Sequence, residues 1–471
     1  MTGKPGEFFA ERAWLGPEQG LATGVLIEHD AGGIITKVRA CVNGSSLGPS
    51  VRRLRGEVCL PGFVNAHSHA FHRALRGLCQ ARAGDLSAWR SLVYEVASRL
   101  TPESYHDLAT AVYAEMLLAG YTSVGEFQYL HHEPGGRPYS DTNAMALALL
   151  GSATASRIRM TLLDTCYLRA GVDGALLEGP ELRFGDGTGE RWAGRFAHLA
   201  SVPLEATQRL GAAIHSVRAV PPPAMSTVVA VAHEHDLPLH FHLSEQRSEN
   251  EQCLKVLGLT PTDVLHDAGA LTRQATAVHA IHLTAGDIGR LGLASCGICA
   301  CPTTERDLGD GAGPFTDLAD AGAVLSIGSG SHAVIDPFEE TRAVDLNERL
   351  SQERRGLWQV GNLLEAGTSG GSRSLAWPTG GIAAGAMADL VTVRLGSPRL
   401  AGCNVAADPA RDAADELLAR IIFCAAPSDV DTVVVAGEVV VEGGEHSTLG
   451  PPAAVAERLR KTVTVALGAG V

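Results

Sequence analysis

Two histidines at alternate positions, His67 and His69, follow an apolar run that ends in Pro61 and Gly62. Side chains two residues apart in a strand point to the same side, so both imidazoles can face one point. Zinc and similar ions take neutral imidazoles as ligands. The segment therefore predicts part of a metal site. The alternative is a polar loop after a strand, because a chain with 18 histidines contains such pairs by chance.

A second segment, HFHLSEQ at 240–246, supplies further groups of the same kind. His242 ends an apolar run, where a third imidazole can reach the same ion, and Glu245 follows three residues later. Hydrolysis at a C=N centre requires an activated water, a proton donor for the leaving nitrogen and a Lewis acid. We interpret Glu245 as the proton shuttle and His240 as supporting structure. The alternative for Glu245 is a surface carboxylate.

His279, in VHAIHL, is another imidazole at the end of an apolar run. A ring nitrogen there can hydrogen-bond to the attacking water or to the substrate's nitrogen. The alternative is a core histidine whose hydrogen bonds are satisfied internally.

Apolar strand candidates alternate with segments of helical period through the middle of the chain, as expected of βα units around a parallel sheet. Several end in polar groups, and an eight-stranded α/β barrel keeps its active site at the carboxyl ends of its strands. There are eight such candidates: the run into His67, 121–127, 157–167, 210–217, 237–245, 275–283, 296–302 and 324–330. The middle of the chain therefore predicts a (β/α)8 barrel.

Short β-like pieces occur at both ends of the chain, and alternating valines around Gly437 predict a hairpin. We expect a small β-sandwich built from both termini, with a closing helix over 451–467. The predicted division is 1–57 and 379–471 for the two parts of the sandwich and 58–378 for the barrel. The glycine- and serine-rich stretch 367–374 is expected to be a surface loop.

The composition excludes several classes of partner. The formal net charge is −14 and no block is rich in Lys or Arg, which argues against nucleic acid or an anionic membrane surface. The sequence contains no run of eighteen apolar residues, so no transmembrane helix is predicted, and the amino terminus lacks a signal-peptide pattern. We expect a cytoplasmic enzyme. The cluster Cys296, Cys299 and Cys301 is interpreted as ordinary strand cysteines rather than a redox or zinc site.

Seven motifs together resemble the amidohydrolase superfamily, and more closely the formimidoylglutamate deiminases, which release ammonia from N-formimino-L-glutamate in histidine degradation. The likeness covers almost the whole chain and implies an eight-stranded barrel, one zinc ion and a homodimer. Fe²⁺ or another divalent ion is the alternative to zinc. The motifs are LPGFVNAHSHAFHRALRG (60–77), GEFQYLHH (125–132), HSVRAVP (215–221), HLSEQ (242–246), VHAIHL (278–283), CPTTERDLGDG (301–311) and GSGSHAVID (328–336).

The resemblance implies a role for each matching position. His67, His69 and His242 would be the metal ligands, Glu245 the proton shuttle, and His279 the partner of the hydrolytic water.

The same resemblance implies a substrate-binding set: His72, Arg90, Tyr129, His215 and Arg218. The implied substrate is a small anionic amidine. Its two carboxylates favour guanidinium groups, which bind them in a bidentate manner.

The sequence departs from the family pattern where the eighth strand ends. The family has G-S-D-S-H, and this chain has Gly330 in place of the aspartate. In the family that carboxylate binds the metal and accepts a proton from the attacking water, and losing a general base costs about 10²–10⁴ in rate. Ser329 or Ser331 can hold a water there, whereas Asp336 is expected to cap the next helix. Gln128, where the family has histidine, is interpreted as a second change in the same pocket.

Four hypotheses follow. The chain is a zinc-dependent deiminase of N-formimino-L-glutamate or a close analogue; a diverged paralogue with altered chemistry in a specialised pathway; or a pseudoenzyme that binds acidic ligands. A deaminase of nucleobases or triazines is disfavoured, because it would not need both Arg90 and Arg218.

Overall fold

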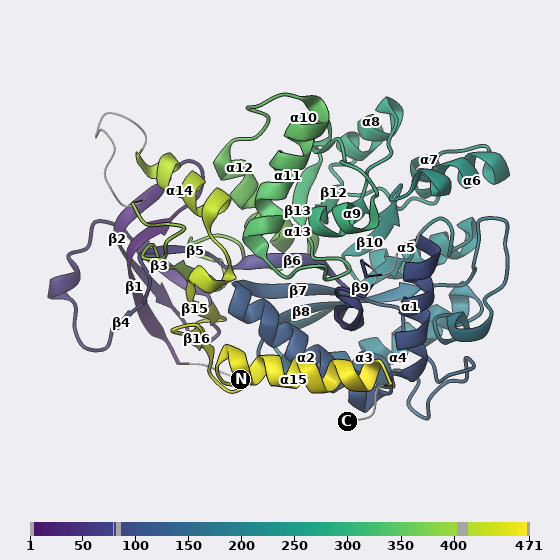
Figure 1. Ribbon diagram of the computed structural model, residues 1–471, viewed down its shortest axis with the longest axis horizontal. Coiled ribbons are helices and arrows are strands. Elements are labelled where there is room, and N and C mark those ends of the chain that lie inside the picture. Colours follow the sequence, from purple (N-terminus) through teal and green to yellow (C-terminus); the bar gives the residue numbers. More distant parts are fainter. Residues whose placement is uncertain (1–3, 79, 82–85, 403–412, 469–471) are drawn as a thin grey trace.

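The computed structural model describes residues 4–78, 80–81, 86–402 and 413–468. Eight parallel strands lie side by side in chain order and form a barrel that occupies most of the molecule (Figure 1). Its first and last strands meet through a parallel bridge between Ser68 and Gly330. The strands are β6 (Phe63–Ser68), β7 (Tyr121–Gln128), β8 (Arg159–Cys166), β9 (Gln208–Ile214), β10 (Leu239–Leu243), β11 (Ala275–His279), β12 (Gly297–Ala300) and β13 (Val324–Ile327).

The barrel strands are continuous buried runs rather than alternating ones, because helices cover their outer side. Every residue of β7 and of β8 is buried. The helices are α1 (Leu86–Arg99), α2 (Pro102–Ala119), α3 (Ala144–Ser156), α4 (Gly189–Ala200), α5 (Pro222–Glu234), α6 (Arg247–Leu257), α7 (Pro261–Asp267), α8 (Ala285–Leu293), α9 (Pro302–Leu308), α10 (Phe315–Asp320), α11 (Pro337–Gln352), α12 (Val360–Glu365), α13 (Gly371–Ser374), α14 (Ala413–Cys424) and α15 (Pro452–Ala466). The predicted barrel and all eight strand candidates are confirmed.

Local sequence signals start several of these helices. The side chains of Thr101, Thr260 and Thr284 accept hydrogen bonds from the first turns of α2, α7 and α8. Asp336 caps α11 by accepting from the backbone N–H groups of Phe338 and Glu339, as predicted.

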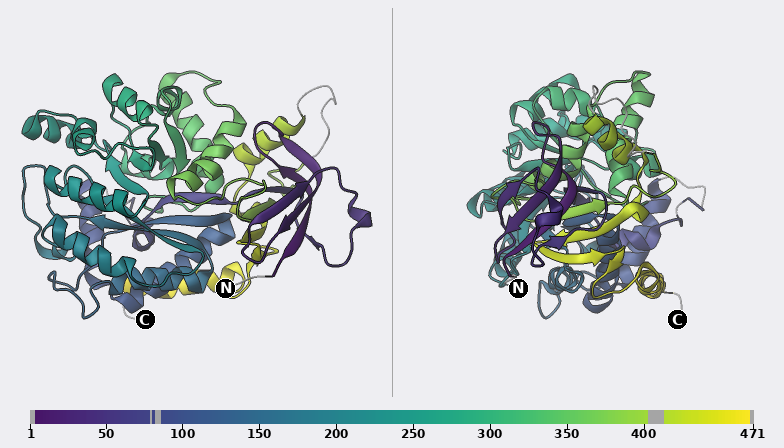
Figure 2. Two further views of the ribbon diagram at one scale, coloured as in Figure 1. Left: turned by 180° about the vertical axis from the view of Figure 1, so that it is seen from behind. Right: turned by 90° about the vertical axis from the view of Figure 1, so that its left-hand side faces the viewer.

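The two ends of the chain join in one nine-stranded mixed sheet beside the barrel (Figure 2). Strand β5 pairs with β1 and with β14, so it connects the amino-terminal strands to the carboxyl-terminal ones. The hairpin predicted around Gly437 is present between β15 and β16. The strands are β1 (Gly6–Trp14), β2 (Leu21–His29), β3 (Ile35–Arg39), β4 (Arg52–Arg53), β5 (Val58–Pro61), β14 (Leu390–Val393), β15 (Val430–Val435), β16 (Glu438–Glu442) and β17 (Glu445–His446).

A buried ion pair joins this sheet to the barrel. Arg159 on β8 donates to both carboxylate oxygens of Asp389, at 2.7 and 2.9 Å, and both side chains are fully buried. Asp389 also accepts a hydrogen bond from the backbone N–H of Ala436. The closing helix α15 packs against α2 along the outside of the barrel (Figure 1).

The prediction of a surface loop at 367–374 is wrong. The segment forms a π-helical turn, Ala366–Gly370, followed by α13, and most of it is buried. A β-carbon on Gly370 would lie 1.9 Å from the carbonyl oxygen of Leu325, and one on Gly371 2.7 Å from Cβ of Val64. The small glycine and serine residues of this stretch therefore allow it to pack closely against the barrel strands.

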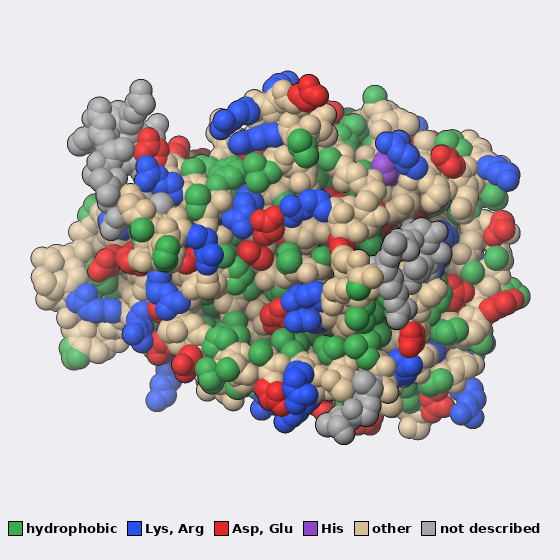
Figure 3. Space-filling model, viewed as in Figure 1, with side chains coloured by type: hydrophobic (Ala, Val, Ile, Leu, Met, Phe, Trp, Pro, Cys, Tyr) green, Lys and Arg blue, Asp and Glu red, His purple; other side chains and the backbone are tan. Residues whose placement is uncertain are grey.

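The face seen in Figure 3 carries Lys and Arg side chains interspersed with Asp and Glu, without a block of one sign. Among the residues that the structure describes, no helix has both the length and the apolar character needed to cross a membrane.

Candidate active site

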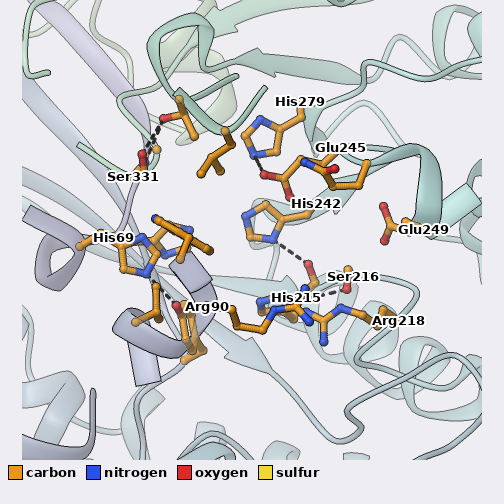
Figure 4. Close-up of a pocket in the computed structure, with 18 of the residues that line it drawn as sticks. His69, Arg90, His215, Ser216, Arg218, His242, Glu245, Glu249, His279 and Ser331 are labelled. Carbon is orange, nitrogen blue, oxygen red and sulfur yellow. Dashed lines mark hydrogen bonds and ion pairs between the residues drawn. The ribbon is translucent and has the colours of Figure 1, made fainter. Parts of the chain in front are cut away.

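The barrel strands end at a cavity of about 510 Å³, and every site residue predicted from the sequence lies in its wall (Figure 4). Carboxyl ends of parallel strands converge at one end of a barrel, which is why residues far apart in the chain meet there. The predicted residues in the wall are His67, His69, His72, Arg90, Tyr129, His215, Arg218, His242, Glu245 and His279.

Three imidazoles converge at one point in this cavity. The Nε2 atom of His67 lies 3.1 Å from Nε2 of His69 and 3.1 Å from Nε2 of His242. His67 and His69 come from the end of β6, and His242 comes from β10. Within the described residues, these three form the group of potential ligands close enough to share an ion.

Hydrogen bonds at the outer nitrogens determine where the protons of two of these rings lie. Nδ1 of His69 lies 3.1 Å from the carbonyl oxygen of Phe127, and Nδ1 of His242 lies 2.8 Å from that of His215. A carbonyl only accepts, so each Nδ1 carries a proton and each Nε2 of a neutral ring presents a lone pair. Burial keeps the rings neutral by lowering their pKa values, that of His242 to about 4.

This donor set fits a divalent cation. Lone pairs that point at one another repel, and a cation between them removes that repulsion. Nδ1 of His67 is also buried and without a hydrogen-bond partner. Three imidazoles leave open coordination positions, as catalytic sites with three protein ligands do.

The wall beside the imidazoles contains Gly330, together with the hydroxyl groups of Thr304 and Ser331. Gly330 also closes the barrel: its N–H donates to the carbonyl of His67, and its own carbonyl accepts from the N–H of His69. The backbone is therefore in place beside the ligands, and the side chain at this position is absent. Among the described residues that line the cavity, only Glu245 and Glu249 carry carboxylates.

Glu245 and His279 lie next to each other in the cavity wall, with 3.4 Å between Oε1 of Glu245 and Nε2 of His279. Nδ1 of His279 contacts Glu305 on the other side of the ring. Burial lowers the pKa of His279, but the two carboxylates outweigh this effect and raise the pKa to about 10. The imidazolium form thus donates to a carboxylate from each nitrogen.

The far end of the cavity carries the positive charge. Arg218 donates to the hydroxyl of Tyr167 at 3.0 Å, and Arg90 lies in the same wall on α1. The hydroxyl of Tyr129 lies 2.9 Å from Nε2 of His72. Two guanidinium groups in one cavity can bind two carboxylates.

The interpretation of Gln128 as part of the pocket is wrong. Its side chain is fully buried at the end of β7, where it donates to the carbonyl of Leu130 at 2.5 Å, and it lies outside the cavity wall. Successive residues of a strand point to opposite sides, so Tyr129 faces the cavity and Gln128 faces away.

The sequence analysis missed Glu249 and Tyr167, which both line the cavity. Glu249 lies in the first turn of α6, a few residues after the HLSEQ motif, and this proximity in sequence was available as a signal. Burial and the nearby Glu245 raise the pKa of Glu249 to about 7.

Residues 58–440 match the amidohydrolase family, and the chain belongs to that family. The predicted resemblance is therefore confirmed. The chain is 36% identical to the formimidoylglutamate deiminase of Pseudomonas aeruginosa over 450 residues, which are 93% of this chain and 95% of the relative. It is 32% identical to the 8-oxoguanine deaminase of the same organism over 394 residues, 81% of each chain.

Solved structures agree with this assignment. An amidohydrolase from Brucella melitensis superposes with a TM-score of 0.85 at 30% identity, over 98% of this chain and all of that one. An adenosine deaminase from Xanthomonas campestris with bound zinc has a TM-score of 0.80 at 22% identity, over 98% of this chain and 99% of that one. The second likeness concerns the fold alone.

Proposed function

We propose that the protein is a metal-dependent hydrolytic deiminase that acts on N-formimino-L-glutamate or a close acidic amidine and releases ammonia. The observation that supports this proposal is the shared cavity, which holds three convergent imidazoles, Glu245, and two arginines. The similarity to a formimidoylglutamate deiminase along most of both chains supports the same substrate class.

His67, His69 and His242 would hold the metal ion, with zinc as the first expectation. When bound, a divalent cation lowers the pKa of water and polarises the C=N bond of the substrate. Arg90 and Arg218 would bind the two substrate carboxylates, which leaves the formimino group free to point toward the imidazoles.

Glu245 would carry the proton. Water adds its oxygen to the formimino carbon, and Glu245 passes one proton of this water to the terminal nitrogen, which becomes an amine. Glu245 then takes the second proton from the same oxygen as the formyl C=O forms and delivers it to that nitrogen, so the C–N bond breaks, ammonia leaves and the N-formyl product remains. His279 stands next to Glu245, at a distance suited to hydrogen-bonding the same water or nitrogen.

Gly330 supports a second candidate. Without a carboxylate at this position, the wall beside the imidazoles offers only backbone groups and the hydroxyls of Thr304 and Ser331. A diverged enzyme acting on a related amidine, or a protein that binds acidic ligands without turnover, would retain the arginines and tolerate this change.

The test is ammonia release from N-formimino-L-glutamate by zinc-loaded protein, with zinc content measured on the same sample. We expect turnover together with about one zinc per chain. A Glu245→Gln variant, which keeps the shape of the side chain and cannot accept the proton, serves as the matched control and should lose activity about 10²–10⁴-fold. Stoichiometric zinc without turnover, combined with binding of N-formyl-L-glutamate, would favour the second candidate.

A further inference from the structure

A buried carboxylate that the proposed reaction does not use lies directly behind His279. Glu305, on the first turn of α9, is 1% exposed. Its Oε1 atom accepts a hydrogen bond from the backbone N–H of Cys301 at 2.8 Å and lies 3.3 Å from Nδ1 of His279. The other carboxylate oxygen is buried and has no partner. A buried group with one oxygen unpaired is costly, which calls for a reason beyond packing.

The contact with Glu305 determines which nitrogen of His279 can exchange a proton. An ionised carboxylate only accepts hydrogen bonds, so Nδ1 must be the donor. Nε2 is then the nitrogen that faces Glu245 and the cavity. We propose that Glu305 is a positioning residue, which keeps the proton of His279 on Nδ1 so that Nε2 alone serves the reacting groups. The kinetic part of this inference rests on the proposed function.

The backbone at His279 is strained, so contacts from neighbouring residues are needed to hold this residue in place. His279 and Ala280 have φ angles of +70° and +53°, in the left-handed region that side chains with a β-carbon avoid. Such conformations are strained and persist where surrounding contacts impose them. Here the N–H of Ala280 donates to the carbonyl of Leu243 on the neighbouring strand at 2.9 Å. The ring of His279 is therefore held by Glu305, and its backbone is held by the hydrogen bond to Leu243.

The loop after α9 connects Glu305 to the segment that carries Glu245. The N–H of Asp310 donates to the carbonyl of Glu305, and the side chain of Asp310 accepts from Gln246, the residue after Glu245. One short segment therefore contacts His279 through Glu305 and the neighbour of Glu245, Gln246, through Asp310.

The competing explanation is that Glu305 only caps α9, because its side chain reaches back to the N–H of Cys301 at the start of the helix. Glutamine serves this capping role as well as glutamate does. The two explanations therefore differ for Glu305→Gln. Capping alone leaves the variant unchanged, whereas positioning requires the negative charge that excludes a proton donor facing Nδ1.

The experiment compares wild type, Glu305→Gln and Glu340→Gln as zinc-loaded full-length chains. Glu340 is the matched control: it is fully buried, and it accepts hydrogen bonds from the N–H and hydroxyl of Thr303 at the same helix start rather than from His279. Imidazole ¹⁵N spectra, assigned with a His279→Gln variant and recorded where the ring is neutral, report which nitrogen carries the proton. Steady-state kinetics with N-formimino-L-glutamate report kcat and KM.

We expect the Nδ1-protonated form in wild type and in Glu340→Gln, and a shift toward the Nε2-protonated form in Glu305→Gln. The same variant should lose about 10²-fold or more in kcat with little change in KM, because Nε2 of His279 is then no longer held toward the reacting groups, which affects the proton transfer rather than binding. An identical tautomer in all three proteins would overturn the inference. If wild type released no ammonia, the proposed function would fail, and the ¹⁵N comparison would still decide the role of Glu305.

Discussion

The hydroxyl oxygen of Thr304 lies 2.5 Å from the point that a β-carbon on Gly330 would occupy. Gly330 also has a φ of +48°, in the left-handed region. Thr304 is held where it is, because it donates to the carbonyl of Ser329 and accepts from the N–H of Ser331. The wall beside the imidazoles is therefore packed around glycine, and a side chain added here needs space that Thr304 occupies.

We expect Gly330→Asp combined with Thr304→Ala to raise deiminase turnover at least about tenfold, a partial recovery of the roughly 10²–10⁴-fold that a general base contributes. Aspartate tolerates the left-handed backbone better than most residues, and removing the Thr304 hydroxyl relieves the closest contact. Gly330→Asp alone should gain less and should melt at a lower temperature. Ammonia release, zinc titration and thermal unfolding measure the three effects.

The matched control for this pair is Gly330→Asn with Thr304→Ala, which has the same shape without the charge. It should bind zinc no better than wild type. If the aspartate variant bound zinc tightly and stayed as inactive as the parent, the assignment of position 330 to the reacting centre would be wrong.

His242 and His240 provide a direct test of the metal site, since both are buried histidines on β10. Nε2 of His240 bonds to the carbonyl of Ser374 at 2.9 Å, away from the other imidazoles. His242→Ala should weaken zinc binding by more than the roughly 10–100-fold typical of losing an outer-shell partner. His240→Gln should lower stability and keep zinc affinity, as measured by competition with a chelator. Equal zinc loss in both variants would contradict the proposed ligand set.

Arg218 should account for part of the affinity for dicarboxylates. Arg218→Met is expected to weaken binding of N-formyl-L-glutamate by about 10–100-fold, the value of one charge-assisted hydrogen-bonding group, about 1.5–3 kcal/mol. Isothermal calorimetry measures this effect without requiring turnover. Arg169→Met is the control, because Arg169 lies on the same side of the barrel, donates to the carbonyl of Leu168, and is not in the cavity wall. An equal loss in both variants would exclude Arg218 as a specific anchor.

The buried His131 should make stability depend on pH. Burial, together with the nearby Arg195, lowers the pKa of His131 to about 4. An unfolded histidine titrates near 6.5, so between these values the unfolded chain binds the extra proton. This contribution to stability is complete above about pH 6.5 and is lost as the pH falls toward 4, by about 2 kcal/mol between pH 7 and 5. Thermal midpoints at pH 7 and 5 should therefore differ less for His131→Gln than for wild type. Identical differences would contradict the prediction.

Periodicity and motif spacing were sufficient to predict the barrel and its eight strands, and the family resemblance supplied ten of the residues that line the cavity. Parallel strands alternating with helices close in chain order, so the carboxyl ends of all eight meet without further information. His67, His69 and His242 were predictable for this reason: each lies at the end of a buried strand. The hairpin at Gly437 and the cap at Asp336 were predictable because they depend on residues only a few positions apart.

Contacts between segments that are distant in the sequence decided the features that were not predicted. The burial of 367–374 depends on how closely Gly370 approaches Leu325, and the composition of that stretch indicates a loop equally well. The side on which Gln128 lies depends on the register of β7, and the contact of Glu305 with His279 depends on α9 reaching β11. The packing of Thr304 against Gly330 likewise joins two strand ends 26 positions apart. Such contacts are set by the closure of the barrel, a long-range property that local sequence patterns do not encode.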